Sequence, residues 1–272
     1  MTFATGAVLA LVSCSRSSDP GSTNLNKKLV AQWPSSATNP AQSIPAYPVA
    51  LTGGVQIVAG RVGQAFSFDG RQAYAVVAHS PDLDFGAGQD FSVMAWIKPE
   101  HADTSFGVMP IVEKRKVGGI TTAVGWELCV AYGRLAFQLT PAAPWNLKVR
   151  DFSSPSRVRA AWQRKSAMAV VSSFHSPGPE LRDGEFHHVA VTVRRDSKSG
   201  GSLYVDGVVV MTFDPTKLSG SLANKEPLLI GTHPDTTLHC PYQGMIEDIR
   251  LYSRALSAAE IEAASRRNEL KR

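Results

Sequence analysis

The sequence has 272 residues, of which 43% are hydrophobic and 19% are charged. This balance suits a folded domain with a sizeable core rather than a disordered chain, and the length allows one large domain or two ordinary ones. The formal net charge of +5 is mild for this length, so it permits an acidic partner without demanding one. The 22 Gly and 17 Pro favour many turns and therefore an all-β architecture.

Residues 7–14 form a short apolar run ending in Leu-Val-Ser-Cys, which resembles the lipobox of bacterial lipoproteins. The run is too short to span a bilayer as a helix, but it suits the hydrophobic segment of a signal peptide. No Lys or Arg precedes it, so a mildly apolar tail remains the alternative. We predict a signal or lipobox-like segment over residues 1–14, lipidated at Cys14, and a flexible linker over residues 15–27. The protein is then exported, and a lipid anchor is its only contact with the membrane.

Short runs of β-formers separated by turn signals fill the chain from residue 55 onwards. Residues 91–98 alternate between the two faces of a strand and end at Pro99. Further strands are expected within residues 60–70 and over residues 73–77, 108–113, 125–131, 135–139, 228–230 and 244–252. Strands this short at such spacing predict a sandwich or jelly roll.

The block from residue 183 to residue 211 carries the clearest antiparallel signal. Over residues 186–194, valines and His187 fall on one face of a strand, while His188, an alanine and a threonine fall on the other. Asp206 and Gly207 then separate two runs of β-formers. A two-residue Asp-Gly loop fits a type I′ turn, whose twist matches that of the flanking strands. This block therefore predicts a strand followed by a β-hairpin.

One helix is predicted, at the C-terminal end of the domain. Ser257 and Glu260 have the spacing of a capping box, with Ser257 as the N-cap residue. Ile261 is expected to dock the helix on a sheet. Residues 266–272 form a charged tail that frays.

Six motifs follow one another along the chain. They include Gly-Arg-Val-Gly-Gln-Ala-Phe-Ser-Phe-Asp-Gly over residues 60–70, Ser-Pro-Asp-Leu-Asp-Phe over 80–85 and Asp-Phe-Ser-Val-Met-Ala-Trp-Ile-Lys-Pro over 90–99; the remaining three cover residues 186–192, 203–207 and 244–261. Each is weak alone, but in this order they resemble a LamG-like jelly-roll domain of the concanavalin A-like lectin/glucanase superfamily, in its common bacterial form.

The resemblance implies an all-β fold over residues 28–265: a two-sheet antiparallel jelly-roll β-sandwich with a short C-terminal helix. It also implies a binding module, often for carbohydrate and sometimes for protein. The chain departs from the family pattern in three places, one of which is the segment over residues 151–174, longer and more basic than in relatives. Residues 35–40 lack the carboxylates that relatives commonly carry there, and Phe186 replaces the usual Trp.

Many members of this family hold a structural calcium ion, which requires several oxygen ligands including carboxylates. By resemblance, the family's acidic pair falls on Glu247 and Asp248, and Asp69 and Asp84 are further turn carboxylates. The alternative is that Glu247 and Asp248 are ordinary strand residues, with Asp248 paired to Arg250 or Arg254. The missing N-terminal carboxylates weigh against calcium.

Histidines and cysteines offer other chemistry. His187 and His188 are adjacent on a strand, so their rings point to opposite faces and cannot chelate one ion together. We expect hydrogen-bonded, half-buried histidines instead. In an exported chain, Cys129 and Cys240 are the pair available for a disulfide, although two buried thiols remain the alternative.

The sequence contains no catalytic motif. It lacks the Glu-x-Asp-x-x-Glu strand of laminarinase-type relatives, and Glu180, Asp183 and Glu185 have the wrong spacing for it. We therefore predict a protein that is not an enzyme. A basic run over residues 148–165 lies near two tryptophans and suits an anionic glycan, with a solvated loop as the alternative; no nucleic-acid-binding motif accompanies it. The expected ligand-binding residues are Trp126, Trp145, Trp162, Arg157 and Arg159.

The sequence thus predicts a non-catalytic, lectin-like binding module of the cell envelope or exterior, whose partner is a glycan or cell-surface polymer. Two alternatives remain open: a structural or protein-interaction domain without a sugar site, and a diverged glycoside hydrolase. An exposed aromatic row in a groove favours the first reading. A groove filled by its own side chains favours the second, and two facing carboxylates favour the third.

Overall fold

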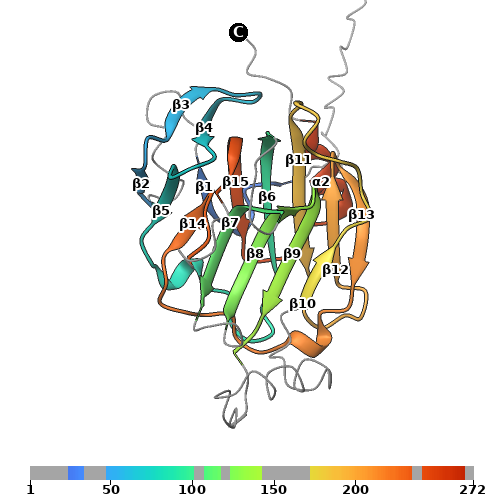
Figure 1. Cartoon of the computed structure of the whole chain (residues 1–272). Coiled ribbons are helices and arrows are strands. Elements are labelled where there is room, and N and C mark those ends of the chain that lie inside the picture. The colour runs from blue at the N-terminus through green and yellow to red at the C-terminus, as the bar shows by residue number, and fades with distance from the viewer. Residues whose placement is uncertain are drawn as a thin grey trace, which may run out of the picture.

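The computed structural model describes residues 24–33, 47–100, 107–117, 123–142, 172–234 and 241–266. Within these ranges the chain forms two antiparallel β-sheets packed face to face, with one α-helix near the C-terminal end (Figure 1). The predicted fold class, an all-β jelly-roll sandwich with a short C-terminal helix, is confirmed. Among the described residues, no helix is both long enough and apolar enough to cross a membrane.

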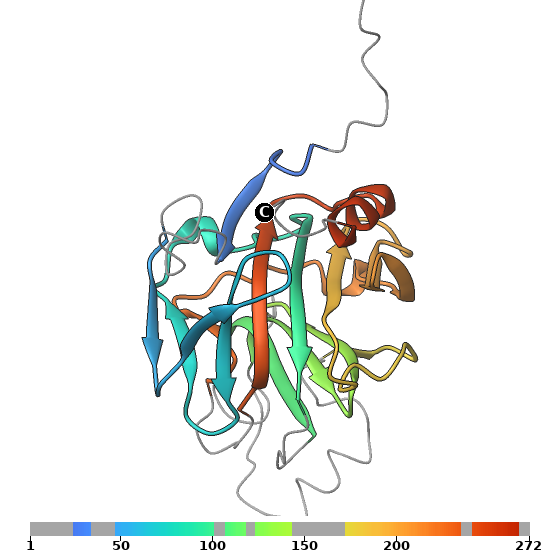
Figure 2. The same ribbon diagram turned by 90° about the horizontal axis from the view of Figure 1, so that it is seen from above.

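The first sheet has the strand order β13-β12-β11-β6-β15-β4-β3, and β1 pairs with β15 off this path. Figure 2 shows β1 beside the end of β15. The bounds of its strands are β1 (Leu29–Trp33), β3 (Gln56–Ala59), β4 (Gln64–Asp69), β6 (Phe91–Pro99), β11 (His187–Val193), β12 (Gly201–Val205), β13 (Val208–Phe213) and β15 (Gln243–Tyr252).

The second sheet has the order β10-β9-β8-β7-β14-β5-β2, which can be followed across Figure 1. Its strands are β2 (Val49–Thr52), β5 (Tyr74–Val77), β7 (Val108–Lys116), β8 (Val124–Ala131), β9 (Arg134–Thr140), β10 (Ser172–His175) and β14 (Leu228–Ile230). Two short 3₁₀ helices lie in connections, η1 (Pro81–Leu83) and η2 (Thr216–Leu218).

The core lies between the sheets because each strand alternates apolar and other side chains. In β11, Val189, Val191 and Val193 are fully buried in the main core cluster, while Ala190 packs on the opposite face. This is the alternation predicted from the sequence. Aromatic rings fill the middle of the core; Phe85 stacks on Phe91 with centroids 4.3 Å apart.

The hairpin between β12 and β13 also matches its prediction. Val205 pairs with Val208, so the loop is the two residues Asp206 and Gly207, with φ of +50° and +83°. Both angles are positive, as a type I′ turn requires. The Asp206 carboxylate further accepts the backbone N–H of His188 at 2.8 Å, which fixes the turn to the neighbouring strand.

Helix α2 (Ala258–Ser265) covers part of the outer face of the first sheet (Figure 2). Its buried residues Ile261 and Ala264 pack with Met94, Tyr204 and other side chains of that face. The predicted capping box is present, because Ser257 and Glu260 each accept the backbone N–H of the other.

The Glu260 carboxylate also forms a two-pronged ion pair with Arg254, at 2.7 and 2.8 Å. The hydrogen bonds from Arg254 lower the pKa of Glu260 from 4.5 to about 2. A carboxyl that binds its proton less readily in the folded state stabilises that state above its unfolded pKa. The stabilisation is lost as the pH falls from 4.5 towards about 2.

We therefore expect Glu260→Gln to lower the free energy of unfolding by about 1 kcal/mol at pH 7 and by much less near pH 2, where Glu260 is protonated in the unfolded state and about half protonated in the folded state. Urea unfolding at several pH values measures the difference. Glu262→Gln is the matched control, because its partner Arg266 is largely exposed. An equal loss for Glu260→Gln at pH 7 and pH 2 contradicts the ion-pair account.

Candidate functional site

A pocket of about 430 Å³ opens at the end of the sandwich where β6 begins and β15 ends. Its volume falls in the range of about 300–1,000 Å³ that small-molecule sites occupy. Apolar side chains form one part of its wall and polar side chains the rest. The lining residues are Leu29, Val30, Tyr47, Pro81, Asp82, Asp84, Gln89 and Ser253.

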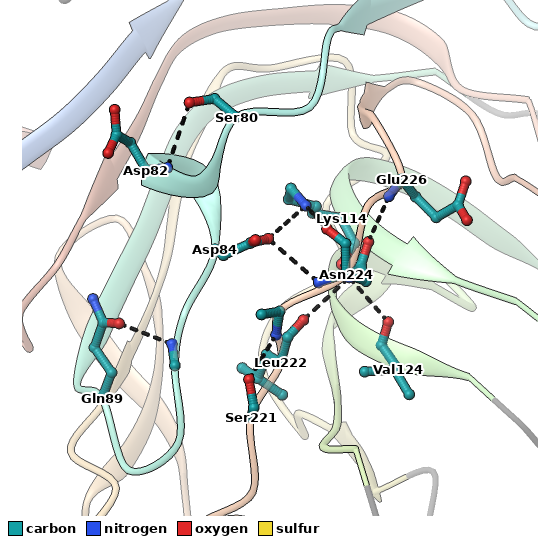
Figure 3. Close-up of polar contacts among 12 residues, drawn as sticks. Ser80, Asp82, Asp84, Gln89, Lys114, Val124, Ser221, Leu222, Asn224 and Glu226 are labelled. Atoms are coloured by element: carbon teal, nitrogen blue, oxygen red, sulfur yellow. Dashed lines mark hydrogen bonds and ion pairs between the residues drawn. The ribbon is translucent and has the colours of Figure 1, made fainter.

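The segment around η1 supplies the acidic wall of this pocket. Ser80 caps η1 by accepting the backbone N–H of Asp82, and proline at the first helical position presets the turn. Leu83 and Phe85 are fully buried in the core. Asp82 and Asp84 alternate with these buried residues, and both line the pocket. Their carboxylates point in different directions, because that of Asp84 is turned to Lys114 (Figure 3).

A polar cluster behind Asp84 holds this wall in place (Figure 3). The Asp84 carboxylate accepts Lys114 Nζ at 2.6 Å, and the same nitrogen donates to the Asn224 carbonyl at 2.7 Å. The Asn224 amide in turn donates to the carbonyls of Lys114, Val124 and Leu222, at 3.1–3.3 Å. Lys114 is only 1% exposed, so the ion pair closes the end of the core and ties η1 to the second sheet.

Other lining residues of the pocket carry hydrogen-bonding groups. Tyr47 donates its hydroxyl to Asp82 Oδ2 at 2.8 Å, and Trp33 Nε1 donates to the Tyr47 carbonyl at 3.1 Å. Burial and then the bond to Asp82 raise the pKa of Tyr47, so the hydroxyl stays protonated. Gln89 accepts the Gly86 N–H at 2.8 Å, and its amide nitrogen points away from that bond (Figure 3). The pocket thus offers carboxylate, amide and hydroxyl groups to a polar ligand.

A second polar cluster lies on the outer face of the second sheet. Cross-strand register places Glu113 of β7 opposite Glu127 of β8, and Glu127 opposite Gln138 of β9. Arg115 Nη2 lies 3.0 Å from a Glu113 oxygen and 2.9 Å from a Glu127 oxygen, and Arg115 also contacts His233. These are two facing carboxylates, the feature expected of a glycosidase.

The arrangement of this pair does not suit glycoside hydrolysis. The two glutamates are 0% and 1% exposed, so the face is closed to solvent at this point. A glycosidase needs open space between its carboxyl groups for the sugar, whereas here the Arg115 guanidinium bridges them. Burial raises the pKa of Glu113 well above its ordinary value, against the opposing effect of Arg115. We interpret the cluster as a buried structural ion-pair network.

The expectation that Trp126 offers an exposed platform is wrong. Trp126 is 1% exposed and belongs to the main core cluster, where its ring lies 5.7 Å from that of Phe85. It sits on the inner face of β8 with Leu128 and Val130, so its ring serves packing. The other predicted ligand-binding residues, Trp145, Trp162, Arg157 and Arg159, lie outside the described residues.

All three predicted calcium ligands accept hydrogen bonds from protein donors. The Glu247 carboxylate accepts the backbone N–H groups of Arg61 and Val62 at 2.7 and 3.1 Å. Its burial raises its pKa to about 7, although those donors act in the opposite direction. Asp248 accepts Arg250 Nε at 2.8 Å, the pairing given above as the alternative to calcium binding.

The third predicted ligand, Asp69, accepts the backbone N–H groups of residues 71–73 at 2.9–3.3 Å, which lowers its pKa. Within the described ranges, no three His, Cys, Asp or Glu side chains gather as a metal site. The groups present at these positions donate hydrogen bonds to the carboxylates and leave them poorly suited to a cation. Calcium binding stays a prediction that these residues do not support.

The histidine rings point to opposite faces, as predicted. The expectation of a half-buried, hydrogen-bonded ring holds for His187 but is wrong for His188, which is 2% exposed and whose Nδ1 is unpaired among the described residues. His188 is buried beside Trp96, with ring centroids 5.3 Å apart, and burial lowers its pKa to about 3. His187 contacts Asp206 at 2.8 Å and Asp183 at 3.1 Å, and mainly the bond to Asp206 raises its pKa. The two rings do not share a site.

Cys129 is buried on the outer face of β8, with Sγ 3.7 Å from the Ala136 carbonyl oxygen. Its predicted partner Cys240 lies outside the described residues, as does Cys14. The disulfide and the lipid anchor therefore stay predictions.

Comparison with known proteins places the chain in a family. A family model described as the concanavalin A-like lectin/glucanases superfamily matches residues 69–262. The chain belongs to this superfamily. No curated protein matched the sequence.

Solved structures with the same fold include several toxin binding domains. The binding domain of Paraclostridial Mosquitocidal Protein 1 is 14% identical with a TM-score of 0.62, covering 88% of this chain and 52% of that one. The ligand-binding domain of botulinum neurotoxin serotype D, solved with N-acetylneuraminic acid, is 14% identical with a TM-score of 0.57, covering 88% and 51%. The chain thus spans about half the length of these toxin domains.

Domain 4 of AbnA, an extracellular arabinanase from Geobacillus stearothermophilus solved with arabinotriose, also has this fold. It is 16% identical with a TM-score of 0.53, and the match covers 88% of this chain and 98% of that domain. At these identities the likeness extends to the fold alone.

Sequence reasoning missed the pocket, although the signal was present. The stretch over residues 80–85 is a turn-rich motif in which the sequence offered Asp84 only as a turn carboxylate for calcium and gave Asp82 no role. Its strict alternation of acidic and apolar residues was the available clue, because the apolar members must face the core. The partners Lys114 and Asn224 are distant in sequence, and only the fold brings them together.

We expect Lys114→Met to lower the free energy of unfolding by about 3 kcal/mol, because Asp84 loses the cation that compensates its burial. Chemical denaturation at pH 7 measures the loss. Lys116→Met, at the exposed end of the same strand, should change stability by less than about 0.5 kcal/mol. Equal effects of the two substitutions contradict a stabilising role for the cluster.

Proposed function

We propose that this domain is a non-catalytic binding module that holds a carbohydrate in the pocket beside η1. The observation that carries the proposal is the pocket itself, in which two carboxylates, an amide and two hydroxyl-bearing residues line one cavity. Sugar hydroxyl groups both donate and accept hydrogen bonds, so they match such a mixed set of groups. Membership of the superfamily supports a binding role.

The solved structures support the same function by analogy. A domain of this fold was solved with arabinotriose, and another with N-acetylneuraminic acid. Because fold alone does not define function, the argument for this chain rests on its own pocket. The proposed location of the module is the cell envelope or exterior, on the basis of the lipobox-like segment before Cys14.

The charge of the pocket predicts which sugars it selects. Of the eight described lining residues, none is cationic and two are aspartates. Lys114 is not a lining residue, and its ammonium group is already paired with the Asp84 carboxylate. Asp82 accepts a hydrogen bond from the neutral Tyr47 hydroxyl and keeps its negative charge. An acidic sugar meets this like charge, so neutral sugars and amino sugars are preferred. The basic run predicted to attract anionic glycans lies outside the described residues.

A domain for protein interaction without a sugar site is the second candidate. The closed outer face of the second sheet favours it, because the Glu113–Arg115–Glu127 network fills a surface where a ligand would otherwise lie. Hydrolysis is disfavoured by the same network. The two functions differ in a single observable, which is binding of free oligosaccharides.

We expect the full chain to bind neutral or amino oligosaccharides on a glycan array, equally well with calcium and with chelator. Asp82→Asn and Gln89→Ala should each weaken the tightest interaction by about tenfold or more, equivalent to about 1.4 kcal/mol, because the first removes a charged acceptor and the second an amide from the pocket. Asp196→Asn is the control, since Asp196 is highly exposed and does not line the pocket.

Unchanged affinity in both pocket variants contradicts the assignment of the site. A preference for acidic glycans contradicts the charge argument. Absence of any glycan binding favours the protein-interaction function, and release of new reducing ends from a bound oligosaccharide favours a hydrolase.

A further inference from the structure

The turn between β8 and β9 holds an aromatic residue in a backbone conformation that aromatic residues rarely adopt. Ala131 pairs with Arg134, so the loop consists of Tyr132 and Gly133, with φ of +51° and +81°. A type I′ turn favours Asn, Asp or Gly at the first position, as Asp206 shows in the other hairpin. Tyrosine with positive φ carries strain, which structures retain mostly where it serves a function.

The strained tyrosine is also the most exposed of the large hydrophobic side chains among the described residues, at 68%. Its backbone N–H donates to the Gly107 carbonyl at 2.6 Å, which helps to hold the turn. A Cβ at Gly107 would lie 2.7 Å from the Tyr132 ring, so the ring rests against glycine backbone. The structure thus fixes a large ring in solvent instead of burying it.

A charged pair is fixed against Gly133, the second residue of this turn. Arg182 and Glu180 form two parallel hydrogen bonds, at 2.6 and 3.0 Å, and the Glu180 side chain is exposed. The pair packs so closely on Gly133 that a Cβ there would collide with both carboxylate oxygens. Leu181 anchors the segment, because its side chain is fully buried and its N–H donates to the Gly133 carbonyl at 2.8 Å.

We propose that Tyr132 is a stacking platform for a sugar ring, with the Glu180–Arg182 pair hydrogen-bonding its hydroxyl groups. The inference rests on the proposed function, since it takes the ligand to be a carbohydrate. An aromatic face beside directional polar groups matches a sugar, which has an apolar ring face and a polar edge. A stable protein partner would instead require about 800 Å² of surface.

This platform and the pocket lie at opposite ends of the sandwich. Tyr132 follows Ala131, which pairs with Val108 at the start of β7, whereas the pocket wall contacts Lys114 near the end of β7. The two sites therefore act on separate parts of a long polysaccharide or on two chains. A polymer gains affinity by reaching both sites.

The experiment compares the full chain with Tyr132→Asn, Tyr132→Phe and Val208→Asn for binding to soluble arabinan, laminarin and mannan. Val208 is the control because it follows the other type I′ turn and is similarly exposed, at 65%. We expect Tyr132→Asn to bind the preferred polysaccharide about tenfold more weakly, while Tyr132→Phe and Val208→Asn retain affinity. Tyr132→Asn should also unfold at a higher temperature, because asparagine suits the turn.

Wild-type affinity in Tyr132→Asn overturns the platform. If Asp82→Asn is then the variant that loses binding, the proposed function stands and the platform alone fails. If the wild-type chain binds none of the three polysaccharides, both fail. Weaker binding by Tyr132→Phe as well as Tyr132→Asn also overturns stacking as the cause, because phenylalanine keeps the ring.

Discussion

The buried ion pair between Lys114 and Asp84 is the contact on which the candidate site depends. Lys114 faces the inner side of β7, where an ammonium group is costly to bury without a partner. Asp84 and the Asn224 carbonyl supply that partnership, so the end of the core closes over a charge that is fully engaged. The same contact fixes η1 against the second sheet. The pocket wall is therefore set by the requirements of folding, and a ligand meets groups that are already in position.

Alternation along the strands gives the two faces of the second sheet different roles. The inner face carries the core, including Trp126. The outer face carries Glu113 and Glu127, bridged by Arg115, and it is closed where a cleft would be needed for catalysis. Ligand contacts are thereby left to the two ends of the sandwich, where loops and turns present side chains to solvent. A common fold thus supports a site through its connections, which is why relatives of the same architecture differ in what they hold.

The sequence correctly predicted those features that are determined by residues close together in the chain. The alternation of β11, the Asp206–Gly207 turn and the capping box of α2 each depend on residues close together in the chain, and all are confirmed. The facing of Glu113 and Glu127 depends on register between strands, which a bulge between Pro110 and Val112 shifts. The prediction that Trp126 binds a ligand was wrong. Trp126, Leu128 and Val130 occupy alternate positions of β8, so the sequence pattern already placed all three side chains on the face that packs into the core. The role of Tyr132 had no local signal, because a Tyr-Gly pair is not a usual turn sequence.

The most direct test of this account is hydrogen–deuterium exchange of the full chain, alone and with the oligosaccharide that binds best on the array. Exchange reports local opening, so a ligand slows it where it holds the structure. The account predicts added protection over residues 80–90, which form the pocket wall, with unchanged exchange in the central strands β7, β8 and β9 away from the Tyr132–Gly133 turn. Protection confined to β7, β8 and β9, with none over residues 80–90, would contradict it, because it would place the ligand on the face that the Arg115 network closes.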